Sequence, residues 1–270
     1  MNKNGTFSEA ACAVLNAADP LKKTSAAFAA QKILEKTAGA GQIGDALPPA
    51  SPARPLKPFL VPPGDVPRRK LGSIAGRAAL LHAIAHIEFN AIDLAFDMAV
   101  RFLPEIHRLG LAPSEFASDW IKIGAEEAKH FGLINERLNA LGYAYGDFPA
   151  HNGLWEAAEN TSDSLVARLA IAPLILEARG LDVTPPMIDR LRVAGDEESC
   201  AVLEVIYQDE IGHVACGKRW FDHVCHKMGQ DPGAIFGQLV ERRFRSALRP
   251  PFNHVAREKA GLEPAFYERN

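Results

Sequence analysis

Apolar residues recur every three or four positions through most of the chain, which is the repeat of a helix with one buried face. This pattern predicts four long helices, at about residues 73–103, 114–141, 164–179 and 196–228. No long alternation of apolar and polar residues indicates a sheet. The predicted fold class is therefore all-α.

Shorter helices are predicted at residues 7–18, 21–38, 186–194 and 232–245. The first two carry apolar stripes, formed by Phe7, Ala10, Ala11, Val14 and Leu15 in one and by Phe28, Ile33 and Leu34 in the other. The predicted helix boundaries are Ser73, Pro104, a Ser114 N-cap, Gly142 and Gly229, with an interruption at Gly180 and Pro185-Pro186. Residues 143–160 are aromatic and glycine-rich, so a loop is predicted there.

A proline-rich stretch at residues 39–69 predicts an extended arm, because proline blocks helix interiors and central strands. Its apolar residues suggest that the arm lies on the main body, with a disordered linker as the alternative; they are Leu56, Phe59, Leu60 and Val61. The expected domains are residues 1–70, two helices and the arm; residues 71–230, a four-helix bundle; and residues 231–270, a C-terminal helix and tail.

The composition of the chain limits the classes of protein to which it can belong. With 47% hydrophobic and 23% charged residues and a net charge of −3, the chain resembles an ordinary soluble globular protein, without an electrostatic case for binding nucleic acid or anionic membranes. No uninterrupted apolar run reaches the roughly 18 residues of a membrane span, and the first 15 residues lack a secretory pattern. The four scattered cysteines are expected to be reduced thiols rather than a zinc knuckle, so a cytoplasmic location is expected.

The chemistry-bearing pattern is a repeated pair of residues. Glu127-Ala-Lys-His130 and Glu210-Ile-Gly-His213 each set a glutamate three residues before a histidine, so both side chains point the same way from a helix and can bind one metal ion. Two such pairs, with one glutamate from each of two other helices, form the ligand set of a dinuclear metal centre in a four-helix bundle.

Glu88 and Glu177 are the candidates for the two further glutamates. The residues three, four and seven positions from Glu88 are all apolar, and Glu177 has mostly apolar neighbours at the same spacings. A buried carboxylate is costly unless it is paired, hydrogen-bonded or bound to metal. Residue counts from the helix ends place Glu88 and Glu127 at one height of an antiparallel hairpin, whereas Glu177 and Glu210 meet only if the third helix continues to about residue 194.

Outer residues can orient the ligating imidazoles. Asp209 is a candidate hydrogen-bond partner of His130, and Glu126 is a candidate partner of His213. The alternative for both is simple exposure at the surface. Tyr207 is either a hydrogen-bond donor near the ligands or a packing residue of the core. His82 and His86 are interpreted as polar-face histidines rather than ligands, although either could line a substrate entrance. His223 and His226 are interpreted as surface residues. Four glycines leave room for a channel or for close helix packing: Gly124, Gly132, Gly212 and Gly217.

The combination of these residues resembles the ferritin-like di-iron carboxylate proteins over about residues 73–229. More narrowly, three segments look like the bacterial family of unknown function DUF455, which is similar to tRNA-modifying di-iron monooxygenases; they are His86-Ile-Glu88-Phe-Asn-Ala-Ile-Asp93, Glu177-Ala-Arg-Gly-Leu-Asp182 and Gln208-Asp-Glu-Ile-Gly-His213-Val. The resemblance implies an antiparallel ferritin-like bundle in which Glu127 and Glu210 bridge two metals, Glu88 and Glu177 are terminal, and each histidine binds one metal. The proline-rich arm departs from the minimal ferritin pattern, which argues against a storage cage.

Three functions are compatible with this site. The leading hypothesis is an oxidase or hydroxylase that activates O₂ with two Fe ions, or with Mn or a mixed Fe/Mn pair, to act on an unidentified small organic substrate. An electron-donor protein is the other expected partner of such an enzyme. A homodimer is compatible with the sequence. The mildly acidic net charge does not support a tRNA substrate, but it does not exclude one. The second hypothesis is iron or manganese handling, by a ferroxidase or storage protein, and the third is a bundle whose site serves stability alone.

Overall fold

The computed structural model describes residues 5–39, 41–66, 70–244 and 248–268. Within these ranges every regular element is helical, and the one β-type contact is an isolated bridge between Leu60 and Ala150, so the all-α prediction is confirmed. The chain forms two compact units, Met1–Gly153 and Leu154–Asn270. The domain boundaries drawn from the sequence stay a prediction.

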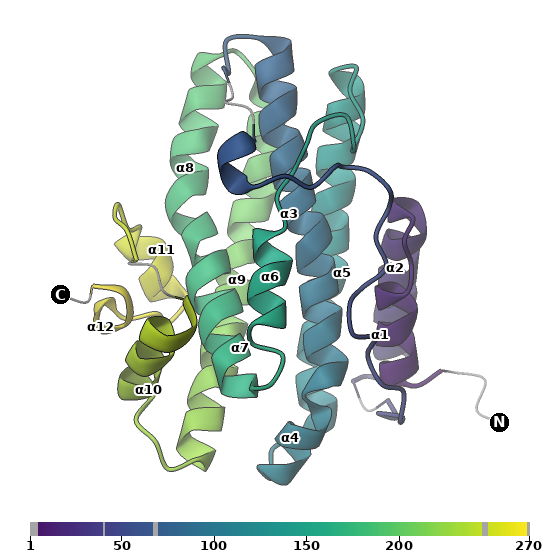
Figure 1. Cartoon of the computed structure of the whole chain (residues 1–270), viewed down its shortest axis with the longest axis vertical. Coiled ribbons are helices and arrows are strands. Elements are labelled where there is room, and N and C mark those ends of the chain that lie inside the picture. Colours follow the sequence, from purple (N-terminus) through teal and green to yellow (C-terminus); the bar gives the residue numbers. More distant parts are fainter. Residues whose placement is uncertain (1–4, 40, 67–69, 245–247, 269–270) are drawn as a thin grey trace. The chain divides into compact units, whose positions relative to one another are not determined.

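The first unit is built on two long helices, α3 and α5, that pack side by side (Figure 1). Its elements are α1 (Phe7–Leu15), α2 (Pro20–Lys36), a short 3₁₀ turn η1 (Pro63–Asp65), α3 (Ile74–Arg101), α4 (Leu103–Arg108) and α5 (Pro113–Ala140). Ser73 caps α3 by accepting from the Gly76 N–H at 3.1 Å, as its sequence position predicts. The predicted Ser114 cap is wrong: α5 starts at Pro113, whose fixed φ suits the first helical position, with Ala112 as N-cap.

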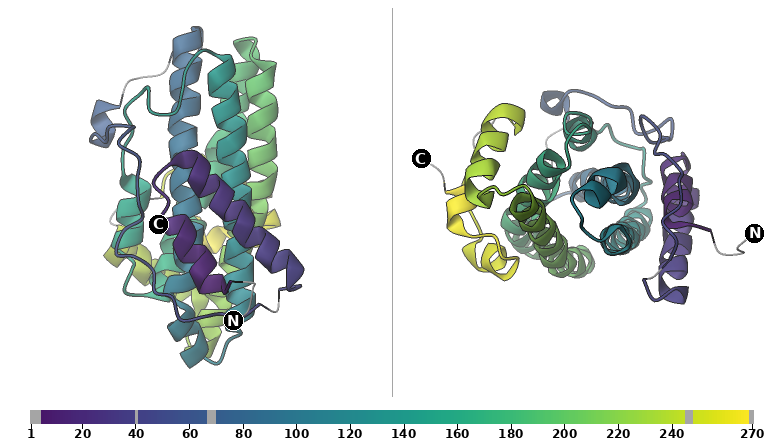
Figure 2. Two further views of the ribbon diagram at one scale, coloured as in Figure 1. Left: turned by 90° about the vertical axis from the view of Figure 1, so that its right-hand side faces the viewer. Right: turned by 90° about the horizontal axis from the view of Figure 1, so that it is seen from below.

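α1 and α2 pack against α3 and α5 (Figure 2). The predicted stripe of α1 is mostly buried, but the predicted stripe of α2 is wrong, because Phe28 is exposed and α2 instead buries Lys23, Ala27 and Ala30. The Lys23 ammonium is fully buried, forms an ion pair with Asp93 of α3 and donates to the Val14 carbonyl at 3.1 Å. A charged side chain therefore anchors α2.

The proline-rich arm lies on the first unit, but not through the apolar residues that suggested it. Leu56 is 96% exposed, and Phe59 and Leu60 are also exposed. Polar contacts hold the arm instead: the Val61 N–H donates to the Ala150 carbonyl at 2.8 Å, and Arg54 approaches Asp93 at 3.5 Å. Part of the predicted stretch, residues 40 and 67–69, lies outside the described residues.

His82 and His86 are buried, so their interpretation as polar-face histidines is wrong. The Gly146 N–H donates to His82 Nε2 at 2.9 Å, and His86 Nδ1 lies 2.8 Å from the Tyr145 hydroxyl. Burial, together with the nearby Arg54 charge and two neighbouring histidines, lowers the pKa of His86 to about 3. Two neutral histidines thus hold the loop after α5 against α3.

The second unit pairs a long, locally irregular helix with α9. Its elements are α6 (Gly153–Glu159), α7 (Leu165–Ile171), the π-helix η2 (Ala172–Glu177), α8 (Ala178–Val193), α9 (Glu197–Lys227), α10 (Pro232–Leu239), the π-helix η3 (Val240–Phe244), α11 (His254–Lys259) and α12 (Pro264–Tyr267). The predicted loop at residues 143–160 is wrong at its end, where α6 buries Trp155. The predicted helix 232–245 changes to a π-helix at Val240, and residue 245 lies outside the described residues.

The interruption predicted at Gly180 and Pro185-Pro186 is wrong, because α8 runs through all three residues. Pro185 has no N–H to donate to the carbonyl of Leu181, four residues earlier. The Asn253 side-chain amide donates to that carbonyl instead, at 3.1 Å. A residue far along the chain therefore supplies a hydrogen bond that the helix cannot make for itself.

α3 is long and apolar enough to cross a membrane by length and composition, although its apolar residues do not form an uninterrupted run. However, 83% of its most apolar 18-residue window is buried inside the protein. This burial is typical of the core helix of a soluble protein.

Candidate metal centre

Three of the predicted ligands meet in the first unit. Glu88 of α3 and Glu127 and His130 of α5 are 3%, 1% and 0% exposed. His130 Nδ1 lies 3.3 Å from Glu88 Oε2 and 3.4 Å from Glu127 Oε2, and one ligand atom from each residue lies within 4.8 Å of the others. Ligands that are each roughly 2 Å from an ion have such separations, so this group can hold a metal ion.

The electrostatics of this group favour a cation. Burial raises the pKa of Glu88, and the neighbouring Glu127 charge raises it further. Burial alone would lower the pKa of His130, but its hydrogen bonds to Glu127 and Glu88 and their charges outweigh that effect and raise it. Two buried carboxylates beside an imidazole need compensating positive charge, which protons or a metal ion can provide.

The second unit carries the other three predicted ligands. His213 of α9 is buried, with its Nδ1 at 3.9 Å from Glu210 Oε2, and the Glu210 side chain is 12% exposed. Glu177 is half-buried at the end of η2. Each unit therefore contains one lone glutamate and one Glu-x-x-His pair.

The register of the second unit follows from one close contact. A Cβ built on Gly217 would lie 2.3 Å from Pro173 Cβ, so these residues face each other across the helix pair. A short turn joins α8 to α9, so the two helices run in opposite directions. Counting four residues from the contact along each helix puts Glu177 near the height of His213, and Glu210 lies about 4.5 Å further along α9.

A π-helix carries Glu177 to this position. Pro173, near the start of η2, cannot donate to the preceding turn, and the backbone widens there for six residues. π-helices are rare and occur frequently at functional sites, because the extra residue per turn changes where the following side chains point. The sequence signal for this feature was Pro173 within an otherwise apolar helix.

The residues predicted to lie around the metal ligands, and the two histidines predicted at the surface, are partly or largely exposed. Tyr207 is half-buried, and its hydroxyl accepts from Asn253 Nδ2 at 2.9 Å. Asp209 and Glu126 are also half-buried. His223 and His226 are exposed, as predicted.

Two of the four glycines serve helix packing rather than a channel. A Cβ on Gly124 would lie 2.5 Å from the Phe96 ring, and Gly217 contacts Pro173 as described above. At Gly132 and Gly212 an added Cβ would meet no neighbouring atom within 4 Å, so packing does not explain these two glycines.

Comparison with known proteins places the chain beside uncharacterised relatives. Residues 16–268 match the family described as "Protein of unknown function (DUF455)". An uncharacterised protein of Haemophilus influenzae (strain ATCC 51907 / DSM 11121 / KW20 / Rd) is 44% identical over 213 residues, which cover 78% of this chain and 73% of that protein. No solved structure matches.

Proposed function

We propose that this chain, which belongs to the DUF455 family of proteins of unknown function, is a dinuclear metalloprotein with a ferritin-like four-helix bundle. Its two metal ions, expected to be iron, would activate O₂ to oxidise or hydroxylate an organic substrate. The observation that carries this proposal is the buried group of Glu88, Glu127 and His130. Buried carboxylates in such a group are stable only with compensating charge.

The repetition of the ligand set supports two ions rather than one. Each unit holds a lone glutamate and a Glu-x-x-His pair on neighbouring helices, and this is the set found in dinuclear carboxylate bundles. In the proposed centre both ions would be held by Glu127 and Glu210, with Glu88 and His130 as further ligands for one ion and Glu177 and His213 as further ligands for the other. Asp209 and Glu126 are proposed to orient the two imidazoles.

Carboxylate and imidazole ligands suit Fe or Mn, and two bound iron ions supply the binding and reduction of O₂. The chain's own contribution is a buried site: Glu127 and His130 lie on one face of α5, and their burial shields them from solvent. Hydroxylation puts one oxygen atom of O₂ into the substrate and reduces the other to water with two electrons and two protons. Hydroxylation therefore requires an external electron donor.

Metal analysis tests the proposal. Purified wild-type protein reconstituted anaerobically with Fe²⁺ is expected to retain about two ions per chain, and the Glu127→Gln, Glu210→Gln double variant is expected to lose most of them. Glu136→Gln is the matched control, because Glu136 lies on α5 but is exposed. Equal iron or manganese in the wild type and a folded double variant would refute the metal centre.

Oxygen consumption then separates the functions. An oxidase or hydroxylase supplied with reductant should consume O₂ over repeated turnovers, and faster when its substrate is present. Oxidation of added Fe²⁺ with a fixed ratio of iron to O₂, and formation of a ferric mineral core, would instead identify a ferroxidase.

A further inference from the structure

The second unit contains a cavity of about 310 Å³ that the metal-ligand residues do not line. One wall comes from η2, through Leu174 and Ile175, and another from the segment after η3, through Leu248 and Phe252. Pockets for small ligands have volumes of roughly 300–1,000 Å³ and mostly apolar walls. This cavity is therefore large enough for a ligand with a short apolar body.

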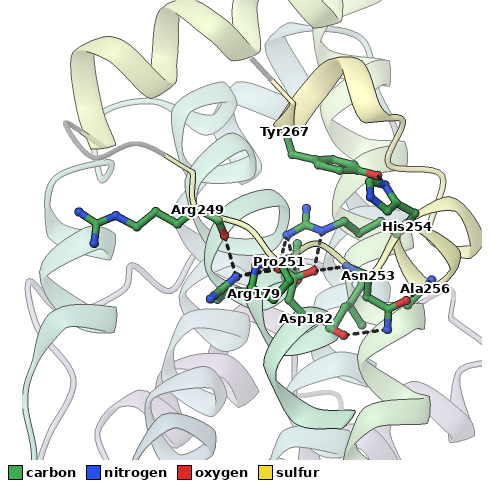
Figure 3. Close-up of polar contacts among 11 residues, drawn as sticks. Arg179, Asp182, Arg249, Pro251, Asn253, His254, Ala256 and Tyr267 are labelled. Carbon is green, nitrogen blue, oxygen red and sulfur yellow. Dashed lines mark hydrogen bonds and ion pairs between the residues drawn. The ribbon is translucent and has the colours of Figure 1, made fainter. Parts of the chain in front are cut away.

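Three arginines, Arg179, Arg249 and Arg257, also line the cavity. Arg257 and Arg179 share a single carboxylate, that of Asp182. Figure 3 shows Arg179 beside Asp182. Arg257 holds both oxygens of Asp182, with Nε–Oδ1 at 2.9 Å and Nη2–Oδ2 at 2.7 Å, and its side chain is only 5% exposed. One negative charge thus faces two positive charges.

Arg179 supplies the excess charge at this end of the cavity. Its Nη1 donates to Asp182 Oδ2 at 3.3 Å and to the carbonyls of Arg249 and Pro251 at 2.9 and 3.2 Å. Those bonds all use one nitrogen, and the side chain is 43% exposed, so the other N–H groups of the guanidinium can meet a ligand. Arg249 directs its side chain away from Asp182 (Figure 3) and forms no ion pair with an acidic residue among those the structure describes.

Attachment of the C-terminal segment to α8 explains only part of this cluster of arginines. Arg257 stacks on Phe252 and Tyr267, with its Cζ 5.1 and 4.5 Å from the ring centres, and its bond to Asp182 ties the C-terminal segment to α8. That role accounts for Arg257 and Asp182. It does not require the second and third arginines or the apolar cavity beside them.

We propose that this cavity binds a small organic monocarboxylate, with its apolar body against Leu174, Ile175 and Phe252 and its carboxylate on Arg179, assisted by Arg249. Guanidinium groups pair with carboxylates through two parallel hydrogen bonds, and the excess positive charge at the Asp182 end matches a single negative charge. The cavity volume, near the lower limit for ligand pockets, favours a short chain or one ring. The proposal does not rest on the proposed metal chemistry, although η2 both lines the cavity and carries Glu177.

Calorimetric titration of the full-length chain with octanoate tests the site. Octanoate is expected to bind at one site per chain, about tenfold more tightly than octanamide, which lacks the charge, or acetate, which lacks the apolar body. Arg179→Gln should weaken octanoate binding about tenfold, because a charged hydrogen bond is lost. Arg192→Gln, which removes an exposed arginine paired with Glu204 outside the cavity, should leave it unchanged.

Several results would overturn the proposal. These are no octanoate binding, binding at several sites, or equal binding by wild type and a folded Arg179→Gln variant. Tight binding of octyl phosphate without binding of octanoate would also overturn it and indicate a phosphate site. If Arg179→Gln does not fold, Arg249→Gln tests the proposal instead. The Arg249 side chain is exposed and makes no ion pair with a described acidic residue, so its replacement should not disturb folding. It should still weaken octanoate binding about threefold.

Discussion

Asn253 donates to the carbonyl of Leu181 at 3.1 Å, and this bond replaces the one that Pro185 cannot form within α8. The same amide nitrogen donates to the Tyr207 hydroxyl at 2.9 Å, and Asn253 Oδ1 accepts from the Ala256 N–H, which caps α11. One side chain thus joins α8, α9 and α11. It supplies the hydrogen bond that Pro185 cannot form within α8.

Replacement of Asn253 is therefore expected to destabilise the protein. Asn253→Ala should lower the free energy of unfolding by about 2 kcal/mol, because it removes an N-cap and leaves the Leu181 carbonyl without its donor. Asn253→Ser keeps a capping oxygen but does not reach Leu181, so it should recover about 1 kcal/mol. Urea denaturation measures both values, and wild-type stability in Asn253→Ala would contradict this account of α8.

The continuation of α8 marks a limit of prediction from sequence. Gly180 and the Pro185-Pro186 pair indicate a break in any isolated helix, and the compensating donor, Asn253, lies in a tail with only a weak helical pattern. Only tertiary structure brings the two together. The burial of His82 and His86 was missed for the same reason, because their partners Tyr145 and Gly146 lie in the loop after α5.

Local patterns predicted the parts that depend on one helix or one hairpin. The all-α class follows from the apolar repeat, and residue counts from the turn bring Glu88 level with Glu127, where His130 contacts both. The arm was harder to predict, because backbone hydrogen bonds and Arg54, rather than Leu56 or Phe59, hold it on the first unit. Apolar content alone does not reveal such contacts.

Gly124 and Gly132 form a matched pair on α5. A Cβ at Gly124 would lie 2.5 Å from the ring of Phe96, which is fully buried, so Gly124→Ala should destabilise the protein by about 1–3 kcal/mol through overpacking. A Cβ at Gly132 meets no atom within 4 Å, so Gly132→Ala should stabilise it by about 0.8–1 kcal/mol through helix propensity. Thermal denaturation should move in opposite directions for the two, and a similar loss in both would show that packing at Phe96 is not the cause.

The buried pair of Lys23 and Asp93 predicts a non-additive double mutant. Burial raises the pKa of Asp93 to about 6, although the charges of Lys23 and Arg54 act in the other direction. Lys23→Met should cost about 3–5 kcal/mol at neutral pH, because it leaves a buried carboxylate with only the more distant Arg54. Lys23→Met combined with Asp93→Leu should recover most of that loss. Additive losses in urea denaturation would show that the two side chains do not act as a pair.

Proton binding at the proposed metal site predicts how metal stabilisation depends on pH. The pKa values of Glu88 and His130 are raised in the folded protein, so the stability these groups contribute without metal is present at low pH and is lost as pH rises above their ordinary values of 4.5 and 6.5. A cation competes with those protons, so it binds more tightly as pH rises. The increase in melting temperature caused by Mn²⁺ should therefore be larger at pH 8 than at pH 6. It should be small at both values in Glu127→Gln and unchanged from wild type in Glu136→Gln. A pH-independent increase, or one that survives in Glu127→Gln, would place Mn²⁺ binding away from Glu88, Glu127 and His130.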